Sequence, residues 1–181
     1  KEISIMKLIA HRTVVRLKEV LASKTKIFIV LELVTGGELF DKIVDAGKFE
    51  PETARFYFQQ LVVGTMFCHQ NGVCHRDLKP DNLLVSADGY VKLGDWGCSR
   101  LLEQCSVPAA AEPSDICTPG YRAPEIYKPL LSEAQRRPQA SVEMLYDRGI
   151  DLWSLGVVCL ELITGRDLLL DEPRRQVEEE A

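Results

Sequence analysis

The chain has 181 residues, a length that suits one domain, and its 46% hydrophobic and 27% charged residues are typical of a soluble globular protein. Its net charge of −5 argues against a general nucleic-acid binder and against a binder of anionic membranes. No membrane span is expected, because the longest apolar run, 152–164, is interrupted by Ser154 and Glu161.

The first third of the chain predicts a helix followed by two strands. Apolar residues recur at helical spacing in the opening segment, so we expect a helix over residues 1–10. Two strand-like runs, 14–20 and 27–33, are rich in apolar and β-branched residues. Residues 22–25 are expected to form the turn between them.

Two helices are expected next. A short one over 38–46 follows Thr35-Gly36-Gly37, which ends the second strand. A longer one over 51–70 has Pro51 in its first turn and ends at Asn71-Gly72, a typical helix stop.

The second half predicts a hairpin, irregular segments and one apolar helix. Residues 83–85 and 90–93 predict two strands around the turn Ser86-Ala87-Asp88-Gly89. The other expected elements are a surface loop at 100–120, irregular chain at 126–148, a buried helix at 152–164 and a charged, solvated tail at 174–181.

The six cysteines, at positions 68, 74, 98, 105, 117 and 159, form no C-x-x-C pair. An even count is weak evidence for disulfides in a chain of this length, so we expect reduced thiols. Reduced thiols favour an intracellular location, the cytoplasm first and the nucleus as the alternative. Cys68-His69 and Cys74-His75 leave a zinc site as another interpretation, although their spacing matches no common zinc module.

The stretch VCHRDLKPDNLL, residues 73–84, places four charged side chains between apolar flanks. Pro80 excludes the interior of a helix. Charges framed by core-type residues cost desolvation free energy unless they are paired or used. This stretch is therefore the main candidate for a functional site.

Four motifs, in this order along the chain, resemble those of protein kinases. Residues 75–82 resemble the catalytic loop H-R-D-L-x-x-x-N, and Asp95-Trp96-Gly97 lies where the metal-binding D-F-G belongs. Ala123-Pro124-Glu125 resembles the A-P-E that closes the activation segment, and 151–156 resembles the start of the buried central helix. The resemblance covers nearly the whole chain and implies a protein-kinase-like α+β fold.

The resemblance implies the following catalytic roles. Asp77 would orient the substrate hydroxyl and accept its proton, and Lys79 would neutralise the transferring phosphoryl group. Asn82 and Asp95 offer hard oxygen ligands, which suit Mg²⁺ held together with the phosphates of ATP.

Three further residues would regulate the site. Arg76 would reach a phosphate on the activation segment through paired hydrogen bonds. Ser114 falls where an activating phosphate usually sits, with a plain loop serine as the alternative. Thr118 would hydrogen-bond Asp77 and Lys79.

The nucleotide would be held by the second strand and the hinge. Leu31 resembles the gatekeeper, and the Glu32 carbonyl and the Val34 backbone would bond adenine, with Leu84 as the floor beneath the base. Glu38 would touch the ribose or a basic substrate residue, unless it is a solvated helix acid.

Two acids are implied to brace the site rather than to contact the substrate. Glu2 resembles the helix Glu that pairs with the ATP-binding Lys. Asp151 would hold the backbone of the catalytic loop, and His75 would pack beneath the metal motif.

Lys79, two residues after Asp77, is typical of serine/threonine kinases. The stretch from Glu2 to Phe49 resembles the calcium/calmodulin-dependent and AMP-activated group, nearest to the plant kinases that bind calcineurin-B-like calcium sensors. The expected reaction is transfer of the ATP γ-phosphate to Ser or Thr of protein substrates. An upstream kinase or a calcium-sensor regulator is the further expected partner, and nucleic acid is not.

Several features depart from the family pattern. We expect a partial kinase domain, with 1–34 as the remnant of the small lobe and hinge and 35–181 as a large lobe truncated near its end. The glycine-rich loop and the ATP-anchoring Lys are absent, so the alternative is a catalytically impaired, pseudokinase-like fragment or interaction module. Trp96 replaces the usual Phe, and an insertion lies within 128–148.

Overall fold

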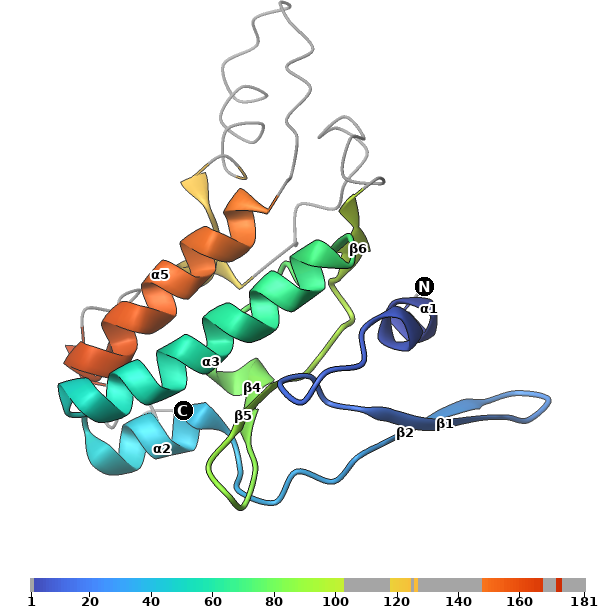
Figure 1. Ribbon diagram of the computed structural model, residues 1–181, viewed down its shortest axis with the longest axis horizontal. Helices are drawn as coiled ribbons and strands as arrows, with labels where there is room; N and C mark the ends of the chain where they lie inside the picture. Colours follow the sequence, from blue (N-terminus) through green and yellow to red (C-terminus); the bar gives the residue numbers. More distant parts are fainter. Residues whose placement is uncertain (1, 103–117, 125, 127–147, 168–171, 174–181) are drawn as a thin grey trace, which may run out of the picture.

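The computed structural model describes residues 2–102, 118–124, 126, 148–167 and 172–173. These residues form helices and short antiparallel strand pairs, which agrees with the predicted α+β class. Figure 1 shows a group of helices on one side and a hairpin that projects away from it on the other. None of the helices in the described ranges has the length and apolar character needed to cross a membrane.

The N-terminal part consists of α1 (Glu2–Leu8) and the hairpin of β1 (Leu17–Ala22) and β2 (Ile27–Leu31). The first predicted strand begins three residues later than expected. Val14 and Val15 do not pair with β2. They lie beside Leu93, whose carbonyl accepts a hydrogen bond from Val15 N at 2.9 Å. This segment therefore joins the hairpin to the rest of the molecule.

The helical part consists of α2 (Leu39–Ala46), α3 (Pro51–Gln70) and α5 (Gly149–Thr164), and α3 and α5 lie side by side (Figure 1). Helix α3 has the predicted bounds, and Gly72 follows it with φ of 72°. Helix α5 begins three residues before the predicted start, because Ile150 and Asp151 are already buried in its first turn.

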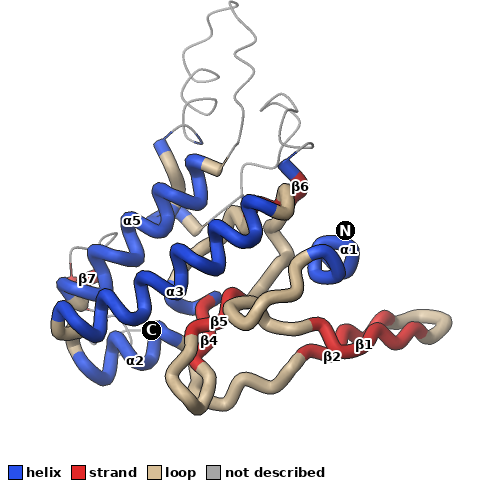
Figure 2. The backbone as a smooth tube through the Cα atoms, viewed as in Figure 1, coloured by secondary structure: helices blue, strands red, loops and turns tan. Residues whose placement is uncertain are grey.

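Short strands and turns frame the segment after α3 (Figure 2). The predicted hairpin is confirmed as β4 (Leu83–Val85) paired with β5 (Val91–Leu93). The pair β3 (Val73–Cys74) and β6 (Arg100–Leu101) was not expected, because two residues are too few for a pattern to be seen. The remaining short elements are the 3₁₀ turns Pro80–Asn82 and Pro119–Tyr121 and the strand pair β7 (Arg166–Asp167) with β8 (Glu172–Pro173).

One apolar core joins the helices to these strands. Leu61 of α3, Val158 and Leu162 of α5 and Leu93 of β5 are each 0% exposed. Gly36 lies against β4 so closely that a Cβ would stand 2.3 Å from the Val85 carbonyl oxygen. The chain just after the predicted hinge therefore lies against the hairpin that precedes the predicted metal motif.

Candidate active site

A side chain of helix α5 holds the backbone of the loop of residues 75–82. The carboxylate of Asp151 accepts hydrogen bonds from the main-chain N–H groups of His75, at 2.9 Å, and Arg76, at 2.8 Å. Arg76 has φ of 71°, a left-handed conformation that a non-glycine residue adopts only at a cost. Asp151 is 0% exposed, so these bonds fix the backbone in a dry environment.

The same carboxylate meets His69 of α3, whose Nε2 lies 2.7 Å from Oδ2 of Asp151. Complete burial alone would raise the pKa of Asp151, but the hydrogen bond from His69, the nearby His75 and the N–H of Arg76 together lower it. Asp151 therefore stays ionised inside the molecule.

The zinc interpretation is not supported by this geometry. His69, Cys74 and Asp151 bring candidate ligand atoms within 4.8 Å of one another, but the Asp151 oxygens already accept three hydrogen bonds. Nε2 of His75 is directed to the Gly94 carbonyl at 2.8 Å, and burial raises the pKa of Cys68 to about 12. Cys68, Cys74, Cys98 and Cys159 form no disulfide within the described residues.

Asp77 is oriented by two neighbours that are distant in sequence. Its Oδ1 accepts from both N and Oγ1 of Thr118, each at 2.9 Å. Its Oδ2 accepts from Nδ2 of Asn82 at 2.9 Å, and the same Nδ2 bonds the Asp77 carbonyl at 2.8 Å. Within the described ranges no hydrogen bond joins Thr118 to Lys79, although the resemblance implied one.

Asp95 stands at the end of the hairpin that leads to the metal motif. Its side chain is exposed, its φ is 47°, and its Oδ1 accepts from the Gly97 N–H at 3.1 Å. Gly94 N donates to the Asn82 carbonyl at 2.8 Å, which joins the two predicted metal-binding segments. Trp96, beside Asp95, is 1% exposed and packs on His75 with ring centroids 4.6 Å apart.

The donor atoms of Asn82 and Asp95 fit a magnesium ion. Since the Asn82 amide nitrogen faces Asp77, its carbonyl oxygen remains for a cation, and the Asp95 carboxylate is exposed. Oxygen ligands of this kind, together with phosphate oxygens, are what Mg²⁺ prefers.

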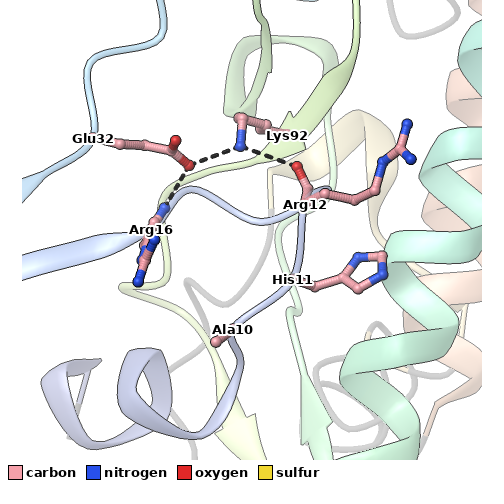
Figure 3. A pocket seen from close by; sticks show the side chains of 6 residues that line it. All are labelled: Ala10, His11, Arg12, Arg16, Glu32 and Lys92. Atoms are coloured by element: carbon pink, nitrogen blue, oxygen red, sulfur yellow. Dashed lines mark hydrogen bonds and ion pairs between the residues drawn. The ribbon is translucent and has the colours of Figure 1, made fainter.

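The sequence did not predict a side-chain contact of Glu32, the predicted hinge residue. Its Oε1 accepts from Lys92 Nζ and from Arg16 N, both at 2.8 Å (Figure 3). Burial alone would raise the pKa of Glu32, but these bonds and the charge of Lys92 lower it. Lys92, three residues before the metal motif in a predicted strand, was the available signal.

Two of the other predicted nucleotide residues, Glu38 and Leu84, lie in adjacent segments. Glu38 forms a bridge with Leu84, which lies between buried neighbours in β4. Partial burial and the charges of Asp41 and Asp81 raise the pKa of Glu38, while nearby Lys79 opposes them. Glu38 is therefore close to the catalytic loop.

The remaining predicted positions differ in exposure. Leu31 is 43% exposed, and Val34 and Glu2 are partly buried. Ser114, Glu125 and the predicted insertion at 128–148, apart from Arg148, lie outside the described residues. The contacts of all these residues with ATP stay predictions.

Comparison with known proteins identifies the family. The sequence model of the protein kinase domain matches residues 1–181. The chain is 47% identical to CBL-interacting serine/threonine-protein kinase 3 and 48% identical to CBL-interacting serine/threonine-protein kinase 26, both of Arabidopsis thaliana. It is 46% identical to CBL-interacting protein kinase 32 of Oryza sativa subsp. japonica.

Each of these alignments covers 91% of this chain and 34% of the relative, so the chain spans about a third of the length of the curated relatives it matches. The motif order, the fold and the family match agree, and the chain belongs to the protein kinase domain family.

Proposed function

We propose that the protein containing this chain is a serine/threonine kinase that transfers the γ-phosphate of ATP to Ser or Thr side chains of protein substrates. The observation that carries the proposal is the orientation of Asp77 by Thr118 and Asn82. A carboxylate fixed from both sides can receive a substrate hydroxyl in one position, and positioning supplies much of the catalysis of phosphoryl transfer.

In the proposed reaction the substrate hydroxyl oxygen forms a bond to the γ-phosphorus as the bond to the β,γ-bridging oxygen breaks. The hydroxyl proton passes to Asp77, ADP leaves, and Lys79 neutralises charge on the transferring group. Asn82 and Asp95 would hold Mg²⁺, which supplies charge neutralisation at the phosphates.

The residue assignments around the nucleotide belong to the same proposal. Residues 1–34 would supply the end of the small lobe and the hinge, with adenine against Leu31, the main chain at Glu32 and Val34, and Leu84. Residues 35–181 would supply the large lobe. Glu2 and Glu38 would act at the phosphate and ribose sides of the nucleotide.

The proposal for regulation rests on the names of the relatives and on the sequence alone. The relatives are named for interaction with CBL proteins, which supports a calcium-sensor regulator for the protein containing this chain. An upstream kinase would act at Ser114, with Arg76 as the receiver of the phosphate. The intracellular location stays a prediction.

The test is Asp77→Asn in the full-length protein, with phosphate transfer to a generic protein substrate as the readout. We expect the rate to fall by about a hundredfold or more, because the variant cannot accept the proton. Asp88→Asn, in the β4–β5 turn, is the matched control and should leave the rate unchanged. Full activity of Asp77→Asn would contradict the base assignment, and an inactive wild type would favour the non-catalytic module.

A further inference from the structure

A cavity of about 390 Å³ lies between the segments that carry the six residues labelled in Figure 3. Three segments form it: the connection between α1 and β1, the residue after β2, and β5. The lining residues are Ala10, His11, Arg12, Arg16, Glu32 and Lys92. Neither Asp77, Asn82 nor Asp95 lines this cavity, so the proposed reaction does not account for it.

Positive charge predominates around the cavity, although the chain as a whole carries −5. The lining holds three cations, Arg12, Arg16 and Lys92, against one acid, Glu32. The acid in the lining, Glu32, already pairs with Lys92, and Lys18 lies near it. Asp88 is the further acid near Arg12 and Lys92. The cavity and its rim therefore attract anions.

The two arginines remain available to a ligand. The Arg12 guanidinium carbon lies 4.4 Å from the centroid of the Tyr90 ring, a cation–π contact, and Arg12 is exposed. Arg16 is exposed, and within the described part of the chain its hydrogen bonds are made by its main chain.

The directions of the arginines indicate the shape of the ligand. In Figure 3 the side chains of Arg12 and Arg16 extend away from each other on two sides of the cavity. Such an arrangement does not clamp a single phosphate between two guanidinium groups. It suits a ligand that presents several separate anionic groups across the cavity.

We infer that this cavity and its two arginines dock an acidic segment of a partner protein in an extended conformation. Glutamate and aspartate side chains on alternate sides of the segment would reach Arg12 on one side and Arg16 on the other. The Glu32–Lys92 pair would form the floor between them. The inference does not depend on catalytic activity.

The probe for this surface is a fluorescein-labelled oligoglutamate peptide, with binding followed by fluorescence anisotropy at low and at physiological salt. We expect binding that weakens with salt, because exposed charge pairs are screened. Arg16→Ala and Arg12→Ala should each weaken binding by about two- to tenfold. Lys24→Ala, a cation removed from the exposed β1–β2 turn, is the matched control and should leave binding unchanged.

Arg16→Lys keeps the charge and should retain most of the binding, which separates loss of charge from loss of fold. Equal weakening by Lys24→Ala and Arg16→Ala would overturn the inference, since binding would then follow overall charge. Absence of binding at low salt would overturn it as well. Competition by inorganic phosphate at concentrations equal to the peptide would show a small-anion site instead.

Discussion

Nε2 of His69 lies 2.7 Å from Oδ2 of Asp151, and this buried contact joins helix α3 to helix α5 directly behind the catalytic loop. The same carboxylate accepts from the N–H groups of His75 and Arg76. One side chain thus connects two helices to the backbone that presents Asp77. The positioning of the proposed base depends on a residue 74 positions later in the chain.

Asp151→Asn should destabilise the protein substantially. The amide has one acceptor oxygen where the carboxylate has two, and its N–H₂ would face a main-chain N–H. We expect a loss of about 3 kcal/mol in the free energy of unfolding, since buried donors lose their acceptor. Urea unfolding would measure it, with the exposed Glu19→Gln as control. A variant as stable as the wild type would contradict this role.

The stability of the protein should fall in acid, because Asp151 becomes protonated there. Because the native pKa of Asp151 is below its ordinary value of 3.8, the unfolded chain takes up the proton first as the pH falls. The contribution of ionised Asp151 to the free energy of unfolding is complete above pH 3.8 and disappears as the pH falls through the native pKa. Unfolding of wild type and Asp151→Asn, compared from neutral pH downward, should give a difference that shrinks in acid. A difference independent of pH would contradict the prediction.

Local signals made part of this structure predictable. Pro51 and Asn71-Gly72 mark both ends of α3, and the turn at Asp88-Gly89 marks the β4–β5 hairpin. Residues 75–82 are predicted to be a catalytic loop because their order along the chain resembles a family pattern. Their chemistry depends on residue types at short spacing, which a sequence displays directly.

The other contacts depend on tertiary packing that no local pattern contains. The pattern at Val14 and Val15 predicts a strand, but these residues contact Leu93 instead of β2. Glu32 was expected to act through its carbonyl, and its side chain pairs with Lys92, 60 residues away. An ion pair between residues so far apart in sequence can be predicted only when the position of the partner segment in the fold is known.

Trp96→Phe should be tolerated, because the ring that packs on His75 is retained. Nε1 of Trp96 is buried and has no hydrogen-bond partner among the described residues, so its removal relieves a desolvation cost that offsets the lost volume. We expect a change of less than about 1.5 kcal/mol in stability, against a loss of about 3–5 kcal/mol for Trp96→Ala.

Tryptophan fluorescence provides an independent readout of the same site. The chain has two tryptophans, and Trp153 is 48% exposed while Trp96 is 1% exposed. Trp96→Phe should therefore remove the blue-shifted emission and leave the red-shifted emission of Trp153. Loss of the red-shifted component instead would show that Trp96 is not buried.

In the full-length protein, Asn82→Ala should weaken Mg²⁺ binding and also disturb the orientation of Asp77, the proposed base. The variant removes a proposed Mg²⁺ ligand and the amide that orients Asp77. We expect the rate of phosphate transfer to fall by about tenfold or more, and the Mg²⁺ concentration for half-maximal rate to rise. The exposed neighbour Asp81 gives the control variant Asp81→Ala, whose Mg²⁺ dependence should match the wild type. An unchanged Mg²⁺ requirement in Asn82→Ala would exclude Asn82 as a metal ligand.

The cysteines should differ in reactivity according to burial. The buried position of Cys68, together with the charge of Asp151, raises the pKa of its thiol to about 12, so little of the reactive thiolate exists near neutral pH. Cys98 and Cys159 are only partly buried and should be alkylated first. Peptide mapping by mass spectrometry after timed iodoacetamide treatment would give the order. In denaturant Cys68, Cys98 and Cys159 should react at similar rates. Native labelling of Cys68 as fast as Cys159 would show that the region behind the catalytic loop opens readily.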